Sequence, residues 1–112
     1  MQRGEIYTAI WPNDPSIKPR PVLIVSNNLQ NNNSAYQDIL VCKITSYLDD
    51  TNNPKKINSA VDKIITLKKQ SIIQCSKIFT LNKTDLVKQI GQISIQDMKD
   101  VDRKLKVALD LP

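Results

Sequence analysis

The chain has 112 residues, enough for one hydrophobic core and too few for two, so we expect a single domain spanning residues 1–112. Its 16 basic and 11 acidic residues give a formal net charge of +5. Because the segment from Ser94 to Pro112 holds four of each sign, the whole excess lies in residues 1–93. This imbalance favours an anionic partner, most commonly nucleic acid, although surface lysines also serve solubility alone.

The absence of histidine removes the usual neutral-pH acid and base and the usual zinc ligand. Cys42 and Cys75 each lie in an apolar run and form no CxxC pair, so we expect buried free thiols and neither a metal site nor a cofactor. No apolar stretch reaches the roughly 18 residues of a membrane span, and the N-terminus lacks the pattern of a signal peptide. We therefore expect a cytoplasmic protein without a membrane partner.

The first half of the chain predicts short strands separated by polar loops, from its alternating or β-branched apolar runs and its proline and asparagine clusters. The expected strands are residues 3–11, 22–25 and 39–44, the last ending in Thr45, Ser46 and Tyr47. The expected loops are residues 12–16, 29–37 and 49–56.

The second half predicts further strands followed by one helix. The expected strands are residues 57–61, 71–81 and 86–93, with turns at residues 68–70 and 82–85. Ser94 and Asp97 have the spacing of a helix-capping pair. One apolar stripe follows at helical spacing, formed by Ile95, Met98, Val101, Leu105, Ala108 and Leu109. The sequence therefore predicts a mainly β protein, a small and strongly curved barrel or sheet covered by a C-terminal α-helix.

Arg20 is the candidate anion-binding residue. It stands between Pro19 and Pro21 at the start of the buried strand, so a stiff segment should present its guanidinium. The chain uses arginine only at positions 3, 20 and 103, which favours a specific use of the planar fork. The alternative is an arginine whose stem merely covers the barrel.

Three segments resemble the MazF/PemK family of toxin endoribonucleases: residues 3–7 as an opening strand, residues 20–27 as the second, and residues 43–46 ending the third. The resemblance covers nearly the whole chain. It implies the SH3-like barrel of MazF/CcdB-like toxins, a homodimer, and sequence-selective, ribosome-independent cleavage of single-stranded RNA such as mRNA. By this resemblance the ribose 2′-hydroxyl attacks without a metal ion, cleavage leaves 2′,3′-cyclic phosphate and 5′-hydroxyl ends, and the toxin inhibits translation and growth.

The resemblance also assigns residues and partners. Arg20 takes the place of the catalytic arginine and Thr45 that of the catalytic threonine, with Ser46 a candidate phosphate contact. A cognate antitoxin, acidic and partly disordered, would cover the RNA groove, and DNA would be reached only through that antitoxin. The chain departs from the family pattern in its short, proline-stiffened loop 13–19 and in Ser76-Lys77, which replaces a frequent acid–glutamine pair.

Several other residues are candidates for RNA binding. Trp11 could stack on a base, lie at a dimer contact or pack in the core. The candidate groove lysines are Lys18, Lys43, Lys55, Lys56 and Lys77. Two alternatives to the nuclease stay open: a catalytically silent toxin of the same fold that binds nucleic acid or a protein such as a topoisomerase, and a structural DNA-binding protein. The joint presence of Arg20 and Thr45 favours the enzyme.

Overall fold

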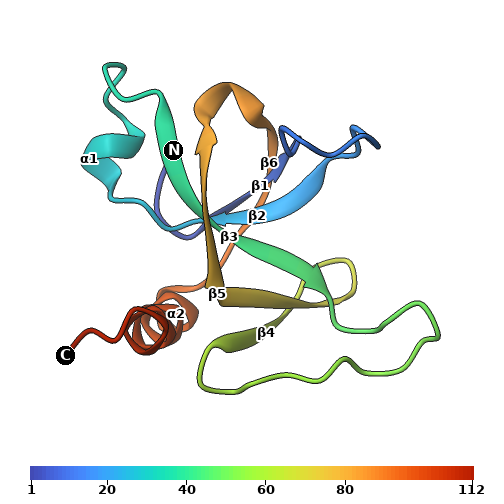
Figure 1. Cartoon of the computed structure of the whole chain (residues 1–112). Helices are drawn as coiled ribbons and strands as arrows, with labels where there is room; N and C mark the ends of the chain where they lie inside the picture. Colours follow the sequence, from blue (N-terminus) through green and yellow to red (C-terminus); the bar gives the residue numbers. More distant parts are fainter.

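Six antiparallel strands and a C-terminal helix form the protein in a computed structural model, which describes residues 1–112 (Figure 1). The strands are β1 Glu5–Ala9, β2 Arg20–Ile24, β3 Asp38–Ser46, β4 Asp62–Thr66, β5 Gln70–Asn82 and β6 Leu86–Gln92. The helices are α1 Asn28–Asn31, the 3₁₀ turn η1 Lys83–Asp85 and α2 Ile95–Ala108. The strands pair in the order β4-β5-β3-β2-β1-β6, which confirms the predicted mainly β architecture with a closing helix. No helix is both long and apolar enough to cross a membrane.

The sheet is curved by an irregularity between its two longest strands. Cys42 of β3 pairs with Ile78 of β5, but the next residue, Lys43, pairs with Gln74. Residues 75–77 of β5 therefore have no partner on β3, and such a bulge bends a strand and increases its twist. The sheet wraps like a barrel wall, but β4 and β6 are not paired with each other, so it stays open.

Both faces of the central strands are buried, which explains the uninterrupted apolar run in β2. Leu23 belongs to a first cluster covered by Val101 of α2, and its neighbours Val22 and Ile24 belong to a second cluster on the opposite face. All four side chains are fully buried. Trp11 and Leu81, which belong to or pack against the second cluster, also line an open cavity on that face of the sheet.

Helix α2 begins as the sequence predicts, since the Ser94 hydroxyl accepts a hydrogen bond from the Asp97 N–H at 3.0 Å. Met98, Val101 and Leu105 pack on the first cluster. The predicted stripe is wrong at its two ends, where Ile95 is 79% and Leu109 is 54% exposed. Only the middle turns of the helix lie against the sheet.

Two local predictions are wrong because asparagine side chains reorganise the backbone. Within the expected loop 29–37, Asn27 caps the short helix α1, and buried Asn31 hydrogen-bonds Ser26. The expected strand 57–61 instead contains a turn. The Asn58 side-chain oxygen accepts a hydrogen bond from the Ala60 N–H at 3.0 Å, and the Asn58 backbone carbonyl accepts the N–H groups of Val61 and Asp62, so β4 begins only at Asp62. Local asparagine bonds outweigh a weak alternating pattern in both places.

The two cysteines are buried free thiols, as predicted. Cys42 and Cys75 both pack in the first cluster. The neighbouring Cys75 thiol, together with burial, raises the pKa of Cys42 well above its usual range. Cys42 is therefore a neutral core side chain.

Candidate active site

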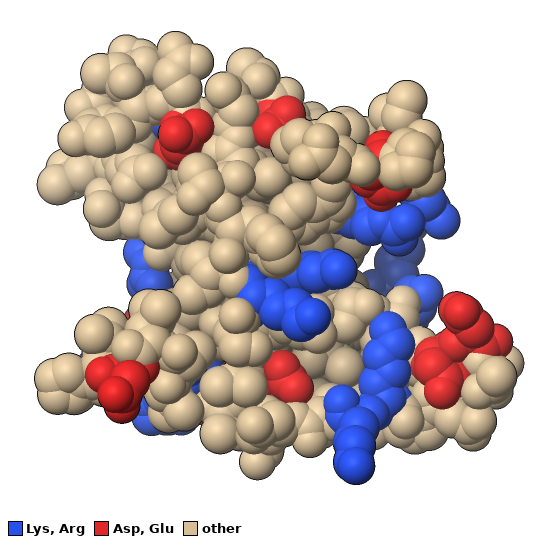
Figure 2. All heavy atoms as spheres, viewed as in Figure 1, with Lys and Arg blue, Asp and Glu red and all other residues tan.

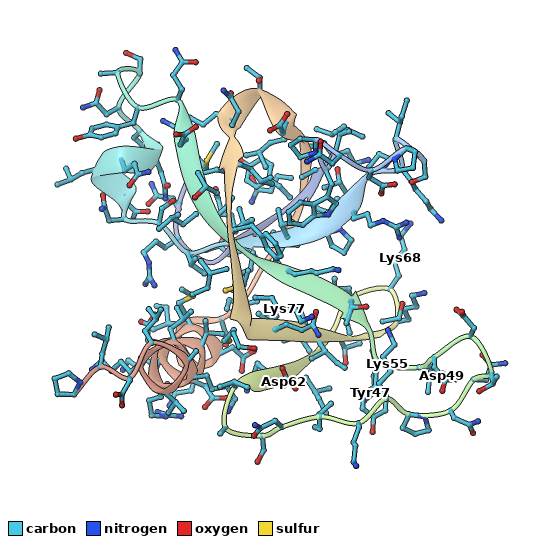
Figure 3. The ribbon with its side chains drawn as sticks, viewed as in Figure 1. Tyr47, Asp49, Lys55, Asp62, Lys68 and Lys77 are labelled. Carbon is cyan, nitrogen blue, oxygen red and sulfur yellow. The ribbon has the colours of Figure 1, made fainter.

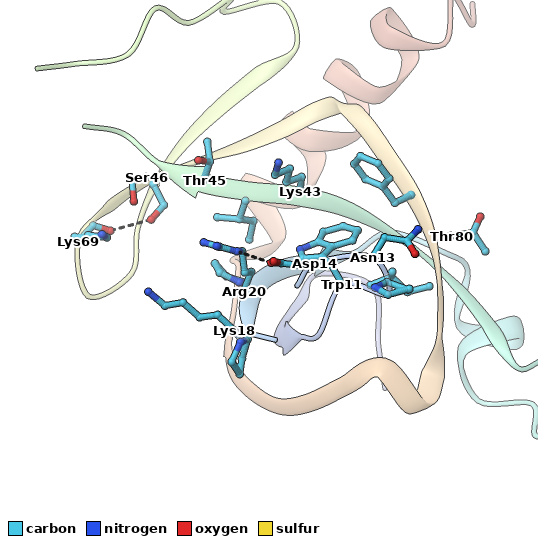
Figure 4. Close-up of a pocket in the computed structure, with 17 residues that line it drawn as sticks. Trp11, Asn13, Asp14, Lys18, Arg20, Lys43, Thr45, Ser46, Lys69 and Thr80 are labelled. Carbon is cyan, nitrogen blue, oxygen red and sulfur yellow. Dashed lines mark hydrogen bonds and ion pairs between the residues drawn. The ribbon is translucent and has the colours of Figure 1, made fainter. Parts of the chain in front are cut away.

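The pairing of β2 with β3 sets Arg20 opposite Thr45. Val22 pairs with Lys43, and continuing this antiparallel register two residues further brings Arg20 across from Thr45. Both line an open cavity of about 860 Å³ on the face of the second cluster (Figure 4). Two side chains 25 positions apart in the chain thus lie at neighbouring strand ends in one cavity.

The loop before β2 holds Arg20 through Asp14. One Asp14 carboxylate oxygen lies 3.4 Å from Arg20 Nε, while the other accepts hydrogen bonds from the Ser16 N–H at 2.9 Å and the Ser16 hydroxyl at 2.7 Å. These bonds from Ser16, with a smaller contribution from Arg20, hold the pKa of Asp14 below its usual range. Arg20 Nη1 and Nη2 have no acceptor within the protein, and its side chain is 47% exposed. The guanidinium can therefore bind an anion in the cavity.

Thr45 receives a hydrogen bond from the loop that follows β3. Lys55 Nζ lies 3.0 Å from Thr45 Oγ1 and donates to it. The hydroxyl proton of Thr45 is then free to be donated to an acceptor in the cavity.

Two aromatic side chains form another wall of the cavity. Trp11 and Phe79 make an edge-to-face contact with ring centroids 5.0 Å apart and an interplanar angle of 73°. Trp11 also packs against the second cluster, whereas Phe79 is 41% exposed. The wall offers an aromatic surface on which a nucleobase could stack.

The cavity carries excess positive charge. Its lining includes the cations Lys18, Arg20, Lys43 and Lys69. Asp14 is the one acidic lining residue. Figure 2 shows lysine and arginine side chains gathered across the middle of the molecule, between the part that contains α1 and the part that contains β4 and α2. This field suits a polyanionic ligand.

Residues 2–109 match the family of PemK-like, MazF-like toxins of type II toxin–antitoxin systems. The chain belongs to this family. The toxin is 32% identical over 114 residues to endoribonuclease MazF6 of Mycobacterium tuberculosis, covering 99% of this chain and 98% of that protein. It is 30% identical to endoribonuclease MazF of Staphylococcus saprophyticus, covering 99% and 92% of the two chains.

Solved structures share the toxin's fold. A mycobacterial endoribonuclease in complex with its cognate antitoxin superposes with a TM-score of 0.75 at 24% identity, covering 100% of this chain and 97% of that one. The MazF chain in a MazE–MazF structure from Deinococcus radiodurans gives a TM-score of 0.73 at 15% identity, covering 100% and 97%. The likeness extends over the entire curved sheet and its helix.

The toxin brings together most of the residues that the sequence singled out. The cavity is lined by Arg20, Thr45, Lys18, Lys43, Ser46 and Trp11. Three candidate lysines, Lys55, Lys56 and Lys77, do not line the cavity. Lys55 contacts Thr45, and Lys77 lies exposed on β5 within the bulge (Figure 3). An RNA contact by Lys77 outside this cavity therefore stays a prediction.

Some cavity residues were not anticipated from the sequence. Asp14 carries a detectable local signal, since an aspartate two residues before a serine is typical of an Asx turn, and it stands six residues before Arg20. Phe79 and Lys69 carry none, because they reach the cavity only through the pairing of β5 with β3 and the turn before β5.

Proposed function

We propose that this MazF-type endoribonuclease toxin cleaves single-stranded RNA, such as mRNA, in the cavity where Arg20 lies across from Thr45. Cleavage would be sequence-selective and independent of ribosomes and metal ions, and it would inhibit translation and growth. The observation that carries the proposal is the convergence, in a cationic cavity, of a guanidinium whose two Nη groups have no acceptor and a hydroxyl whose proton is available.

The substrate supplies its own nucleophile. The ribose 2′-oxygen loses its proton and attacks the adjacent phosphorus, the bond from phosphorus to the 5′-oxygen breaks, and that oxygen takes up a proton. The products are a 2′,3′-cyclic phosphate and a 5′-hydroxyl end. The protein then has to position the phosphate and stabilise the charge that develops on it.

Arg20 and Thr45 meet these two requirements. The two Nη groups of Arg20 can donate a forked pair of hydrogen bonds to the non-bridging phosphate oxygens. The Thr45 hydroxyl donates one more and fixes the phosphate in register. Lys18, Lys43 and Ser46 would contact neighbouring phosphates, and Trp11 would support a stacked base.

Substitution of either central residue tests the assignment. Arg20→Ala and Thr45→Ala should each abolish cleavage of a long, unstructured RNA in EDTA, because transition-state contacts are lost. The measurement is a sequencing map of 5′-hydroxyl ends, with thermal melting to verify folding. Arg103→Ala is the matched control, since Arg103 lies exposed on α2 and should leave the ends unchanged.

The outcomes separate the two functional classes. Full activity in a folded Arg20→Ala or Thr45→Ala variant would contradict the site assignment. A folded wild-type protein that produces no ends would contradict the nuclease and favour the silent binding module.

The proposed partners follow from the family. We infer that the whole chain, residues 1–112, acts as one domain in the cytoplasm and forms a homodimer. Its cationic cavity would be covered by an acidic segment of a cognate antitoxin, through which the pair reaches DNA. A mycobacterial relative whose structure includes its cognate antitoxin supports this partner.

A further inference from the structure

The ammonium group of Lys55 contacts a residue of the proposed site. Its side chain is half-buried, it forms no salt bridge, and the one partner of its ammonium is Thr45 Oγ1 at 3.0 Å. By contrast, Lys63 and Lys104 lie within 4.0 Å of the carboxylate of Asp100. The ammonium of Lys55 therefore points at the proposed site with no carboxylate within 4.0 Å of it, although its charge also contributes slightly to the lowered pKa of Asp49.

We propose that Lys55 is a positioning residue of the RNA-cleaving site, acting through Thr45. The inference rests on the proposed function. An ammonium group has three donors and no acceptor, so Thr45 Oγ1 must accept in this pair. The Thr45 proton is thereby turned away from Lys55 and toward the cavity, and the adjacent positive charge strengthens the hydroxyl as a donor to phosphate.

The loop between β3 and β4 is built to hold Lys55 in place. The Lys55 N–H donates to the Tyr47 carbonyl at 2.8 Å, and Leu48 and Pro54 form an isolated β-bridge. Tyr47, Asp49 and Lys55 come together where this loop leaves β3 (Figure 3). The chain thus returns beside the end of the strand that carries Thr45.

Asp49 closes the tip of this loop. Its Oδ1 accepts hydrogen bonds from the Thr51 N–H at 2.8 Å, the Thr51 hydroxyl at 2.6 Å and the Asn53 N–H at 3.0 Å. Asn52 adopts the left-handed conformation, with φ of 62°, that the tight return requires. The Thr51 and Asn53 bonds hold the pKa of Asp49 below its usual range, so the carboxylate that accepts them is ionised near neutral pH. The position of Lys55 is therefore determined by a folded turn.

The test separates positioning from attraction of RNA. Lys55→Met keeps the length of the side chain and removes the ammonium, and Lys55→Arg keeps a cationic donor. The cleavage rate at saturating protein should fall about 10- to 100-fold in Lys55→Met, the usual effect of losing a hydrogen bond from a charged group, and recover to within about tenfold of wild type in Lys55→Arg. Affinity for an uncleavable RNA with 2′-deoxy at the cut site should change less than about threefold.

Lys99→Met is the control for charge, because Lys99 lies exposed on α2 and pairs with no acid; it should cleave like wild type. Weaker binding of the 2′-deoxy RNA with an unchanged saturated rate would overturn the proposal and make Lys55 an ordinary groove lysine. Wild-type behaviour of Lys55→Met in both measurements would overturn it as well. If wild-type protein itself does not cleave, the proposed function fails instead, so the two failures are distinguishable.

A second position, Asp49, tests the same contact without changing Lys55 itself, so the result does not depend on the folding of one variant. Asp49→Ala should lower the saturated cleavage rate in the same direction as Lys55→Met, and Asp49→Asn, which keeps a side-chain oxygen acceptor, should lower it less. Adding Asp49→Ala to Lys55→Met should cost less than about twofold more, because both changes act through the same contact. Independent, multiplicative losses would contradict this path from Asp49 through Lys55.

Discussion

At the scale of single residues, the proposed site depends on how each charged group is restrained. Arg20 is flanked by two prolines and contacts Asp14 through Nε alone, which leaves its two Nη groups directed at the cavity. Thr45 is restrained in the same sense by Lys55. Each proposed catalytic group is thus oriented by a neighbouring side chain, Asp14 or Lys55, to which we assign no contact with the reacting phosphate.

Removal of the Asp14 carboxylate should loosen Arg20. Asp14→Ala is expected to lower the cleavage rate about tenfold, because the loop loses both its internal Ser16 bonds and its contact with Arg20. Asp14→Asn, which retains an oxygen for Ser16, should lose less. Single-turnover cleavage provides the measurement, and faster hydrogen exchange at the Ser16 amide would report the loosened loop. Equal rates in Asp14→Ala and wild type would refute a positioning role.

The pKa of Asp14 lies below its usual range, so its contact with Arg20 persists at all pH values above about 5. The pH dependence of cleavage above that value should therefore be the same in wild type and Asp14→Asn.

At the scale of elements, the pairing of β2 with β3 builds the site and α2 stabilises the sheet that carries it. Arg20 begins β2 and Thr45 stands next to the end of β3, so one antiparallel register delivers both. The same strands are buried on both faces, which keeps that register from slipping. Helix α2 contributes through Val101, which covers the first cluster.

The N-cap of α2 should contribute measurably to stability. Ser94→Ala removes the acceptor for the Asp97 N–H and is expected to lower the free energy of unfolding by about 1 kcal/mol. Ser94→Asp, which retains an oxygen acceptor at the positive end of the helix dipole, should stay close to wild type. Urea unfolding of the three proteins gives the comparison. An unchanged midpoint for Ser94→Ala would show that the packing of α2 alone determines its start.

At the scale of the whole molecule, a cluster of charges joins the helix to the edge of the sheet. Lys63 of β4 lies 3.0 Å from Asp100 and 3.3 Å from Asp97, both on α2. Arg103 and Lys104 also contact Asp100. Lys63, followed by Arg103 and Lys104, lowers the pKa of Asp100 to about 2. The edge strand β4 is thus fastened to α2 by electrostatic contacts as well as apolar ones.

This cluster predicts a loss of stability in acid. Because the folded pKa of Asp100 lies below the value of about 3.9 in an unfolded chain, its stabilisation is complete above about pH 5 and disappears as the pH falls to about 2. Asp100→Asn should lower the free energy of unfolding by about 1 kcal/mol near neutral pH, a modest value because solvent screens the cluster. Urea unfolding along a pH series should show this difference shrinking below about pH 4. A difference that is constant with pH would contradict the assignment to Asp100 ionisation.

Features that arise from neighbouring residues could be read from the sequence alone. The strands β1, β2, β3, β5 and β6, the turn at Asn82 and the N-cap at Ser94 follow from side-chain alternation and short-range hydrogen bonding. Arg20 and Thr45 were recognisable because each stands at the end of a well-marked strand and because the segments around them resemble a family. The same reasoning failed at Asn31 and Asn58, whose polar side chains form hydrogen bonds that a hydrophobic pattern does not represent.

Only the tertiary structure decided which charges share the cavity. Lys55 reaches Thr45 because the loop folds back beside β3, and Asp14 reaches Arg20 because a turn closes on Ser16. Lys77 lies outside the cavity lining because it falls in the bulge of β5. These placements depend on strand register, a bulge and loop closure, which join residues far apart in the chain. The sequence by itself therefore determined most of the strands, the C-terminal helix and the two residues proposed as catalytic, and the packing of the curved sheet determined what surrounds them.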